Sequence, residues 1–182
     1  MADHVIHIYG GSGSGTTTLA KYISEKAGYF LMDTDHYYWL PADIPYTLKR
    51  SIPERLELMK KDIVEHDKVV ISGSLVGWGD ELIPFFTLAI RLVTDTDVRI
   101  ARLRKREREH FGSRIDPSGD MYKNYLEFIE WASAYDTGGV EMRSKAMHDE
   151  WQKLLKCRQI TLDGNNSKEY NFNVIIKESI RI

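Results

Sequence analysis

The sequence has little of several features that mark whole classes of protein. Cys157 is the one cysteine among 182 residues, so an intramolecular disulfide is impossible, and such sparing use suits a reducing cytosol. The 25 basic and 27 acidic side chains give a formal net charge of −2, which argues against a general nucleic-acid-binding role without excluding a local basic patch. No basic start leads into an apolar run, and the most apolar stretch, residues 82–90, is far shorter than the ~20 residues of a membrane-spanning helix. We therefore expect a cytoplasmic globular protein with no membrane partner.

Apolar runs and turn residues alternate along the chain in a pattern that predicts one α/β domain over residues 1–182. Strands are expected over residues 4–9, 29–32, 68–72, 88–93 and 159–162. Helices are expected over residues 17–26, 53–66, 97–111, 122–135 and 141–155, and in a last segment capped by Ser167. This alternation favours a five-stranded parallel sheet with helices on both faces. Ligands of such folds gather at the carboxyl ends of the strands, so the turns there are the expected functional loops.

A glycine-rich turn follows the first expected strand and opens the first expected helix. Its spacing matches the P-loop pattern Gly-x-x-x-x-Gly-Lys-Ser/Thr, in the run Gly10, Gly11, Ser12, Gly13, Ser14, Gly15, Thr16 and Thr17. Small residues let successive backbone N–H groups surround a phosphate, and the Thr17 hydroxyl can bind Mg²⁺. We therefore predict that this run binds the phosphates of ATP. The alternative is a glycine-rich turn that only packs a strand on a helix.

The P-loop lysine is missing, because Thr16 occupies its position. That lysine supplies a cation to the outer phosphates, and a hydroxyl cannot replace its charge. Another cation could compensate for Thr16. Alternatively, the protein is a nucleotide-binding regulator with little catalysis, acting on DNA or on a partner protein. A third possibility is a phosphate-binding turn that meets some other anion.

Two carboxylates follow the second expected strand, two residues apart. On an extended segment, Asp33 and Asp35 would point the same way. Beside a P-loop, Asp33 could hold Mg²⁺, and Asp35 could accept a proton from an attacking hydroxyl. The aromatic residues that follow, Tyr38 among them, could wall a substrate pocket. The alternative is an Asx turn followed by surface aromatic residues.

Together these motifs resemble those of the small P-loop metabolite and nucleotide kinases. The run Asp33–Asp35 resembles the Asp-x-Asp element of shikimate kinase, and Asp35–Tyr38 resembles the Asp-x-Phe-Tyr element of uridine kinases. Ser72–Ser74 resembles the glycine-bearing substrate loop of shikimate kinase. Over nearly its full length, the chain is similar to a bacterial group described as adenylate-kinase-related or as "topology modulation" proteins. The resemblance implies a three-layer P-loop kinase fold, ATP and Mg²⁺ as cofactors, and a small helical lid at about residues 99–120.

Basic side chains crowd one expected helix and the loop after it. Arg99, Arg102 and Arg106 are spaced to share a helix face, and Arg114 lies in the loop. The resemblance implies a mobile lid whose arginines close over the phosphates. Arg102 would then bind the nucleotide, and Arg106 and Arg114 would neutralise the transferred phosphoryl group and supply the missing cation. A solvated charged helix is the alternative, and the interleaved acidic residues weaken a nucleic-acid-binding interpretation.

The predicted reaction is phosphoryl transfer from ATP to a small hydroxyl-bearing metabolite, nucleoside or nucleotide. Asp35 would act as the base or orient the acceptor hydroxyl. The residues expected to bind the acceptor are Asp35, Tyr38, Arg50, Gly73 and Trp78. A nucleoside monophosphate would instead be suited by Arg50 and Arg55. The resemblance places the adenine base near Asn165, after the fifth strand, although a plain turn explains this segment equally well.

Overall fold

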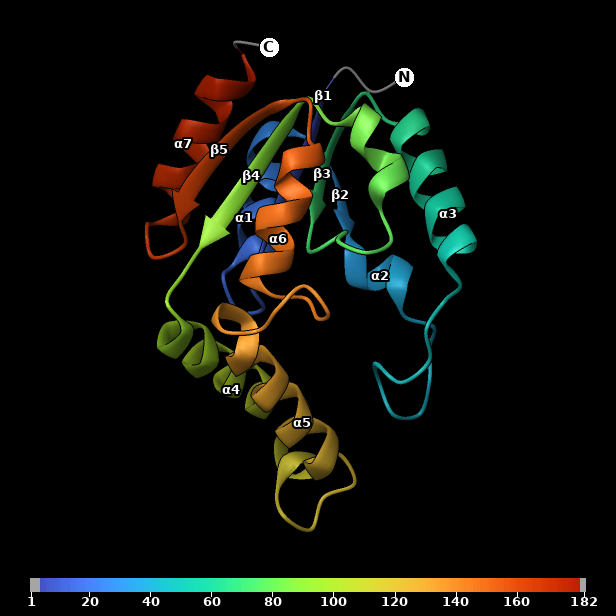
Figure 1. Ribbon diagram of the computed structural model, residues 1–182, viewed down its shortest axis with the longest axis vertical. Helices are drawn as coiled ribbons and strands as arrows, with labels where there is room; N and C mark the ends of the chain where they lie inside the picture. The colour runs from blue at the N-terminus through green and yellow to red at the C-terminus, as the bar shows by residue number, and fades with distance from the viewer. Residues whose placement is uncertain (1–3, 181–182) are drawn as a thin grey trace.

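Five parallel strands form one sheet at the centre of the structure, a computed structural model that describes residues 4–180 (Figure 1). They are β1 (His4–Gly10), β2 (Phe30–Asp33), β3 (Lys68–Ser72), β4 (Leu88–Val93) and β5 (Arg158–Asp163). Their order across the sheet is β2-β3-β1-β4-β5, and every neighbouring pair is parallel. The predicted α/β class and parallel sheet are therefore confirmed.

Helices connect the strands. They are α1 (Thr16–Ala27), α2 (Thr34–Tyr38), α3 (Ile52–Glu65), α4 (Thr96–Phe111), α5 (Tyr122–Ser133), α6 (Lys145–Trp151) and α7 (Lys168–Ser179). Short 3₁₀ segments cover Asp80–Phe85, Gly112–Ile115, Ala134–Asp136 and Gln152–Leu154. None of the helices described between residues 4 and 180 is long and apolar enough to cross a bilayer.

The sheet buries apolar side chains on both faces, because successive strand residues point to opposite sides. Val5 of β1 packs on one face with Met59 of α3 and Trp151 of α6. Its neighbour Ile6 packs on the other face with residues of α1 and with Ile175 of α7. The sheet thus lies between two helical layers, and the carboxyl ends of its central strands point towards the P-loop and α2 (Figure 1).

Helices α4 and α5 extend beyond the carboxyl end of the sheet (Figure 1). They are held together by a small separate apolar cluster, in which Ile100 and Leu103 of α4 meet Ile129 and Ala132 of α5. Because this cluster is separate from the two clusters on the sheet, α4 and α5 form an appendage to the sheet. The lid expected over about residues 99–120 falls within this appendage.

The Ser167 cap is confirmed: its hydroxyl accepts a hydrogen bond from the N–H of Tyr170 at the start of α7. Both ends of α6 differ from the predicted ones for local reasons. The helix expected over residues 141–155 begins only at Lys145, because the hydroxyl of Ser144 accepts a hydrogen bond from the N–H of Met147 and so starts the helix there. It passes into a 3₁₀ turn after Trp151. Residues 141–144 are left as a loop, which matters for the site.

Candidate nucleotide and acceptor site

The P-loop has the backbone geometry of an anion-binding turn. Gly13 and Gly15 adopt φ angles of +83° and +103°, which residues with a side chain rarely adopt. Gly15 precedes α1, and no side chain caps the helix there. The backbone N–H groups of the first turn of α1 therefore remain available to a ligand. The hydroxyl oxygen of Ser14 is buried and has no hydrogen-bond partner among residues 4–180. A buried hydroxyl without a partner, beside the uncapped N–H groups that open α1, fits a phosphate.

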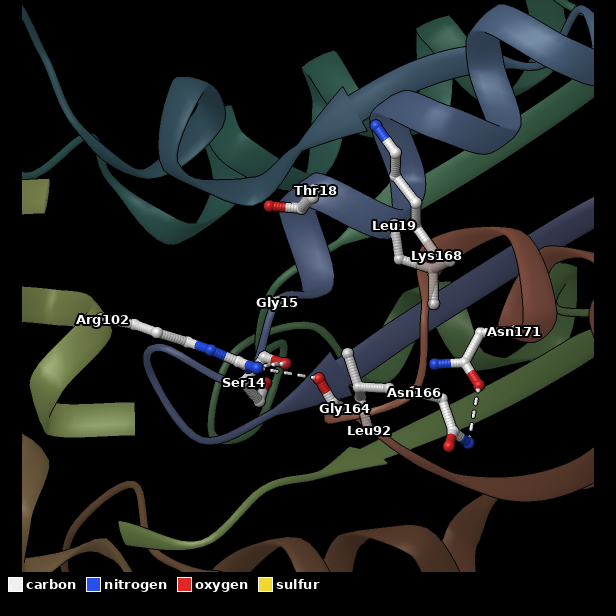
Figure 2. Close-up of a pocket in the computed structure, with 10 residues that line it drawn as sticks. All are labelled: Ser14, Gly15, Thr18, Leu19, Leu92, Arg102, Gly164, Asn166, Lys168 and Asn171. Atoms are coloured by element: carbon white, nitrogen blue, oxygen red, sulfur yellow. Dashed lines mark hydrogen bonds between the residues drawn. The ribbon is translucent and has the colours of Figure 1, made fainter. Parts of the chain in front are cut away.

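A cavity of about 320 Å³ lies between the P-loop, the loop after β5 and the start of α7 (Figure 2). Arg102 of α4 reaches across it, donating from Nη2 to the carbonyl oxygen of Gly164 at 3.2 Å and to Oδ1 of Asn165 at 3.4 Å. Its Nη1 lies 3.5 Å from the carbonyl oxygen of Ser14. The structure therefore brings Arg102 and Asn165 together beside the P-loop. The cavity therefore adjoins the phosphate-binding turn predicted from the sequence.

Three residues whose side chains carry oxygen atoms come from adjacent positions on the other side of the P-loop. The Ser72 hydroxyl lies 3.5 Å from that of Thr17, and Asp33 pairs with Ser72 in the register of β2 and β3. Mg²⁺ prefers such hard oxygen ligands and is bound by one or two carboxylates together with phosphate oxygens. The donor set therefore fits Mg²⁺ beside a bound triphosphate. Ser72 joins the two predicted metal residues here, since its position is set by the sheet register.

Asp33 and Asp35 do not lie on an extended segment, so that expectation was wrong. Residues 34–38 form the short helix α2, and Oδ1 of Asp33 accepts a hydrogen bond from the N–H of Asp35 at 3.2 Å. Asp33 caps the helix because a carboxylate at this position satisfies a free N–H of the first turn. The two carboxylates therefore differ in role: Asp33 is fixed at the strand end, and Asp35 projects from the helix.

The pKa of Asp35 is raised above its ordinary value. The main cause is loss of hydration from the surrounding protein, although the side chain keeps contact with solvent, and the charge of Asp33 adds to it. Arg143 and Arg106 act in the opposite direction. A carboxylate with a raised pKa binds a proton more tightly, which suits a general base.

An aromatic and cationic cluster adjoins Asp35. The guanidinium of Arg55 lies 3.7 Å from the ring centre of Tyr38 and 5.3 Å from that of Trp78. Trp78 donates from Nε1 to the carbonyl oxygen of Ser74, so the cluster is tied to the loop after β3. The predicted acceptor residues Tyr38 and Trp78 are thus close together. Arg55, which reasoning from the sequence named only for one kind of acceptor, lies between them.

The other two predicted acceptor residues hold the backbone of this region. Arg50 donates from Nε to the carbonyl oxygen of Tyr37, and its own carbonyl accepts from Nε of Arg55 at 2.7 Å. Gly73 has a φ of +105°, and a Cβ there would stand 2.0 Å from the hydroxyl of Thr34. The contacts of Arg50 and Gly73 therefore shape the acceptor region. A direct contact of either with substrate stays a prediction.

The lid arginines do not share one environment. Arg99 is fully buried and donates to the carbonyl oxygens of Ser12, Thr94 and Ala132, so it fixes the root of α4 to the P-loop and cannot close over phosphates. It also pairs with Asp136 at 3.1 Å. The expectation that Arg99 closes over the phosphates with the other lid arginines was therefore wrong.

The two other predicted lid cations stand on exposed surface. Arg106 pairs with Glu107 at 2.8 Å, and Arg114 pairs with Asp120 at 2.7 Å. The Arg114–Asp120 pair is exposed on both sides and therefore weak, so Arg114 can exchange its partner at little cost. Glu107 is buried, so moving Arg106 away would leave a buried carboxylate without its cation. Their predicted contacts with the transferred phosphoryl group stay predictions.

Arg143 is the cation that reasoning from the sequence missed. Its Nη2 donates to the hydroxyl of Ser12 in the P-loop at 2.8 Å, and its guanidinium stacks 4.5 Å from the ring centre of Trp131. Loss of hydration lowers the pKa of Arg143 and the charge of Asp35 raises it, but an arginine stays protonated at neutral pH. Only the Gly138-Gly139 break marks its loop in the sequence.

Comparison with known proteins agrees with this geometry. The sequence model of a family described as an AAA domain matches residues 6–124. The uncharacterized protein YqaC of Bacillus subtilis is 41% identical over 162 residues, which cover 89% of each chain. A cytidylate kinase of Archaeoglobus fulgidus is 33% identical over 113 residues, covering 56% of this chain and 61% of the other.

Solved structures show the same fold at low sequence identity. A deoxyadenosine kinase from M. mycoides, with the products dCMP and dCDP bound, superimposes with a TM-score of 0.53 at 16% identity, covering 98% of this chain and all of the other. A shikimate kinase from Acinetobacter baumannii in complex with shikimate gives 0.52 at 14% identity, with 98% and 93% covered.

Proposed function

The chain belongs to the family described as an AAA domain and has the fold of P-loop kinases, and from that premise we propose that it is an ATP-dependent phosphotransferase acting on a small acceptor. One observation carries the proposal: a P-loop with free N–H groups and a carboxylate of raised pKa lie at the same edge of the sheet. The first can hold the donor phosphates, and the second can receive a proton from the acceptor.

The donor would lie with its phosphates in the P-loop and its base in the cavity beside Gly164 and Asn166. Thr17, Ser72 and Asp33 are the residues that would hold Mg²⁺. When bound, this ion neutralises charge on the outer phosphate oxygens. Arg102 contacts both the P-loop carbonyl of Ser14 and the loop after β5, and so would hold the donor cavity together.

Arg143 would supply the positive charge that Thr16 cannot. It donates to the P-loop hydroxyl of Ser12 and is close enough to Asp35 to influence its pKa, whereas Arg99 is buried and bound to carbonyl oxygens. Its position between the donor loop and the proposed base is where charge develops during transfer. The stacking on Trp131 orients the guanidinium plane, and the N–H groups that do not bind Ser12 are left for phosphate oxygens.

Asp35 would act on the acceptor oxygen. The acceptor O–H loses its proton to the Asp35 carboxylate as the oxygen bonds to the γ-phosphorus. The bond from that phosphorus to the β,γ-bridging oxygen breaks, and ADP leaves. Arg106 and Arg114 could reach the transferred group if the appendage closes, since both guanidinium groups stand on exposed surface. Arg114 is held only by an exposed pair, whereas Arg106 would have to stay paired with the buried Glu107.

Arg55 favours an acidic acceptor. Arg55 is only 5% exposed, and it has no salt bridge with any of residues 4–180. Within the same residues its guanidinium donates one hydrogen bond, from Nε to the carbonyl oxygen of Arg50. Burying a cation without a counterion is costly, so a ligand carboxylate or phosphate would relieve the cost. Because Tyr38 and Trp78 contact the face of the guanidinium, its Nη edge is left for a bidentate grip.

The test is release of ADP from ATP and Mg²⁺ over a panel of acceptors. The panel pairs each neutral compound with an acidic counterpart: nucleosides with their 5′-monophosphates, and methyl esters of hydroxy acids with the free acids. Acceptor-dependent ADP that falls at least ~100-fold in Asp35→Asn supports the proposal. Acceptor-dependent ADP that is unchanged in this variant contradicts the role of Asp35.

A second candidate function rests on Thr16, the residue in place of the P-loop lysine. Without that cation, the protein could bind ATP and act as a regulator with little turnover. ATP binding without stimulated ADP release across the whole panel favours the regulator.

A further inference from the structure

A buried histidine closes the loop that carries Arg143. The hydroxyl of Tyr135 lies 2.7 Å from Nδ1 of His148, which is 13 positions further along the sequence. The segment between them, residues 136–147, includes Arg143. Inside this segment, the Ser144 hydroxyl donates to the carbonyl oxygen of Gly139 at 2.7 Å. The loop is therefore pinned at its base by a side-chain pair and tied again within.

His148 is positioned to hold a fixed hydrogen-bonding state. It is 0% exposed, and burial lowers its pKa to about 3, so it is neutral at physiological pH. Its other nitrogen, Nε2, lies 2.9 Å from the hydroxyl of Ser74 in the loop after β3. A neutral imidazole donates from one nitrogen and accepts at the other, so both of its hydrogen-bonding positions are filled.

The partners of His148 reach both halves of the site. The Tyr135 ring packs against the P-loop so closely that a Cβ on Gly11 would stand 3.0 Å from its Cδ1. Ser74 follows Gly73, and its carbonyl oxygen accepts a hydrogen bond from Trp78 in the acceptor cluster. One side chain thus connects the P-loop packing, the Arg143 loop and the loop after β3.

We propose that His148 is a positioning residue for phosphoryl transfer. Its hydrogen bond with Tyr135 clasps residues 136–147 and holds the guanidinium of Arg143 against the P-loop, where it meets the γ-phosphate. The proposal rests on the function proposed above and adds a residue that never touches the substrate. An ordinary core histidine would stabilise the fold without affecting γ-phosphate recognition.

The test compares the affinities for ATP and ADP, each with Mg²⁺, by isothermal titration. The two ligands differ by the γ-phosphate, so the ratio of their dissociation constants reports the contact with Arg143. We expect the wild type to prefer ATP, and Arg143→Ala to reduce the preference about 10-fold, as expected for one charge-assisted contact. Tyr135→Phe and His148→Phe should each reduce it by a similar factor. His148→Asn, whose amide can occupy the Nδ1 position, should restore most of it.

Two controls separate positioning from loss of stability. Ile63→Ala removes a fully buried side chain from α3, and should lower the melting temperature while leaving the ATP to ADP preference unchanged. Combining His148→Phe with Arg143→Ala should reduce the preference no further than Arg143→Ala alone, because both changes remove the same contact.

The outcomes distinguish this inference from the proposed function. A wild type that does not bind ATP contradicts both. A wild-type preference that Arg143→Ala reduces, but Tyr135→Phe and His148→Phe leave intact, overturns the role of His148 alone. A preference that none of the three variants changes overturns the role of Arg143 and the clasp together.

Discussion

Arg143 donates a hydrogen bond to the hydroxyl of Ser12 across 131 residues of sequence, and so places a permanent cation on a P-loop that has no lysine. In the proposed site this contact would compensate for Thr16 at the lysine position. The cation then comes from a different element, and its position depends on tertiary packing.

Exchange of the two cation positions tests this compensation. Arg143→Ala should lower kcat for acceptor-dependent ADP release by about 100-fold, since one charged donor to a developing anion is worth about that much. Adding Thr16→Lys to the Arg143→Ala variant should restore a large part of the lost kcat. The control is Arg104→Ala on exposed α4 surface, which should have no effect. Arg143→Ala with wild-type kcat would exclude compensation by this residue.

If Asp35 is the base, the pH dependence of turnover should follow the protonation of its carboxylate. A base must be unprotonated, so kcat/KM should decrease when the pH is lowered far enough to protonate Asp35. Because the pKa of Asp35 is raised, this decrease should begin at a higher pH than for an ordinary aspartate, whose pKa is ~3.9. In Arg143→Lys, which keeps the charge, this decrease of kcat/KM at low pH (the acid limb of the profile) should occur at nearly the same pH as in the wild type. In Arg143→Ala it should shift to higher pH, because a cation that lowers the pKa of Asp35 is lost. A limb unaffected by Arg143→Ala would contradict the coupling of these two groups.

Arg55 should set the preference for acidic acceptors. Arg55→Met should raise KM for an acidic acceptor by about 100-fold, as expected when a buried charged partner is removed, and leave KM for ATP unchanged. Arg55→Lys should recover little, because a lysine cannot reproduce the bidentate edge. Equal use of acidic and neutral members of a pair by the wild type would contradict the assignment. Circular dichroism of both variants checks that they are folded.

Two buried histidines should make the fold sensitive to acid. Burial lowers the pKa of His7 to about 4 and that of His148 to about 3, whereas the unfolded chain titrates near 6.5. Below pH 6.5 the unfolded state therefore binds protons that the folded state does not. The contribution of the two neutral histidines to the free energy of unfolding is thus largest above this pH and is lost as the pH falls. Between pH 7 and 5 each histidine should cost about 2 kcal/mol in free energy of unfolding.

Urea unfolding at pH 7 and pH 5 measures this loss. His148→Asn should remove about half of the difference in the free energy of unfolding between pH 7 and pH 5, because Asn does not titrate. His36→Gln is the control, since His36 is exposed on α2 and its replacement should leave the difference unchanged. An equal pH dependence in wild type and His148→Asn would contradict the assignment.

Features encoded by local patterns could be predicted from the sequence. The P-loop, the five strands and the Ser167 cap depend on spacing within a few residues, and all three are present. The run after β2 could not be predicted as helical, because one hydrogen bond between Asp33 and the N–H of Asp35 starts a helix of only five residues. Short helices carry too few residues for an apolar period to appear.

Roles set by distant contacts could not be predicted. Arg99 and Arg102 have the same spacing signal, yet Arg99 is fully buried against carbonyl oxygens of the P-loop and α5, and Arg102 spans the donor cavity. Arg143 has no motif at all, since its partner lies 131 residues away. Charge on a helix is visible in a sequence, but burial of that charge depends on what packs against it.

Transfer of label from [γ-³²P]ATP to an acceptor tests the central claim most directly. The wild type is incubated with labelled ATP, Mg²⁺ and the paired acceptor panel, and the products are separated by anion-exchange chromatography. The proposed phosphotransferase should place the label covalently on an acidic acceptor, and Asp35→Asn should abolish this product while still binding ATP. Label that stays in ATP, or appears only as free phosphate with every acceptor, would contradict the proposed function.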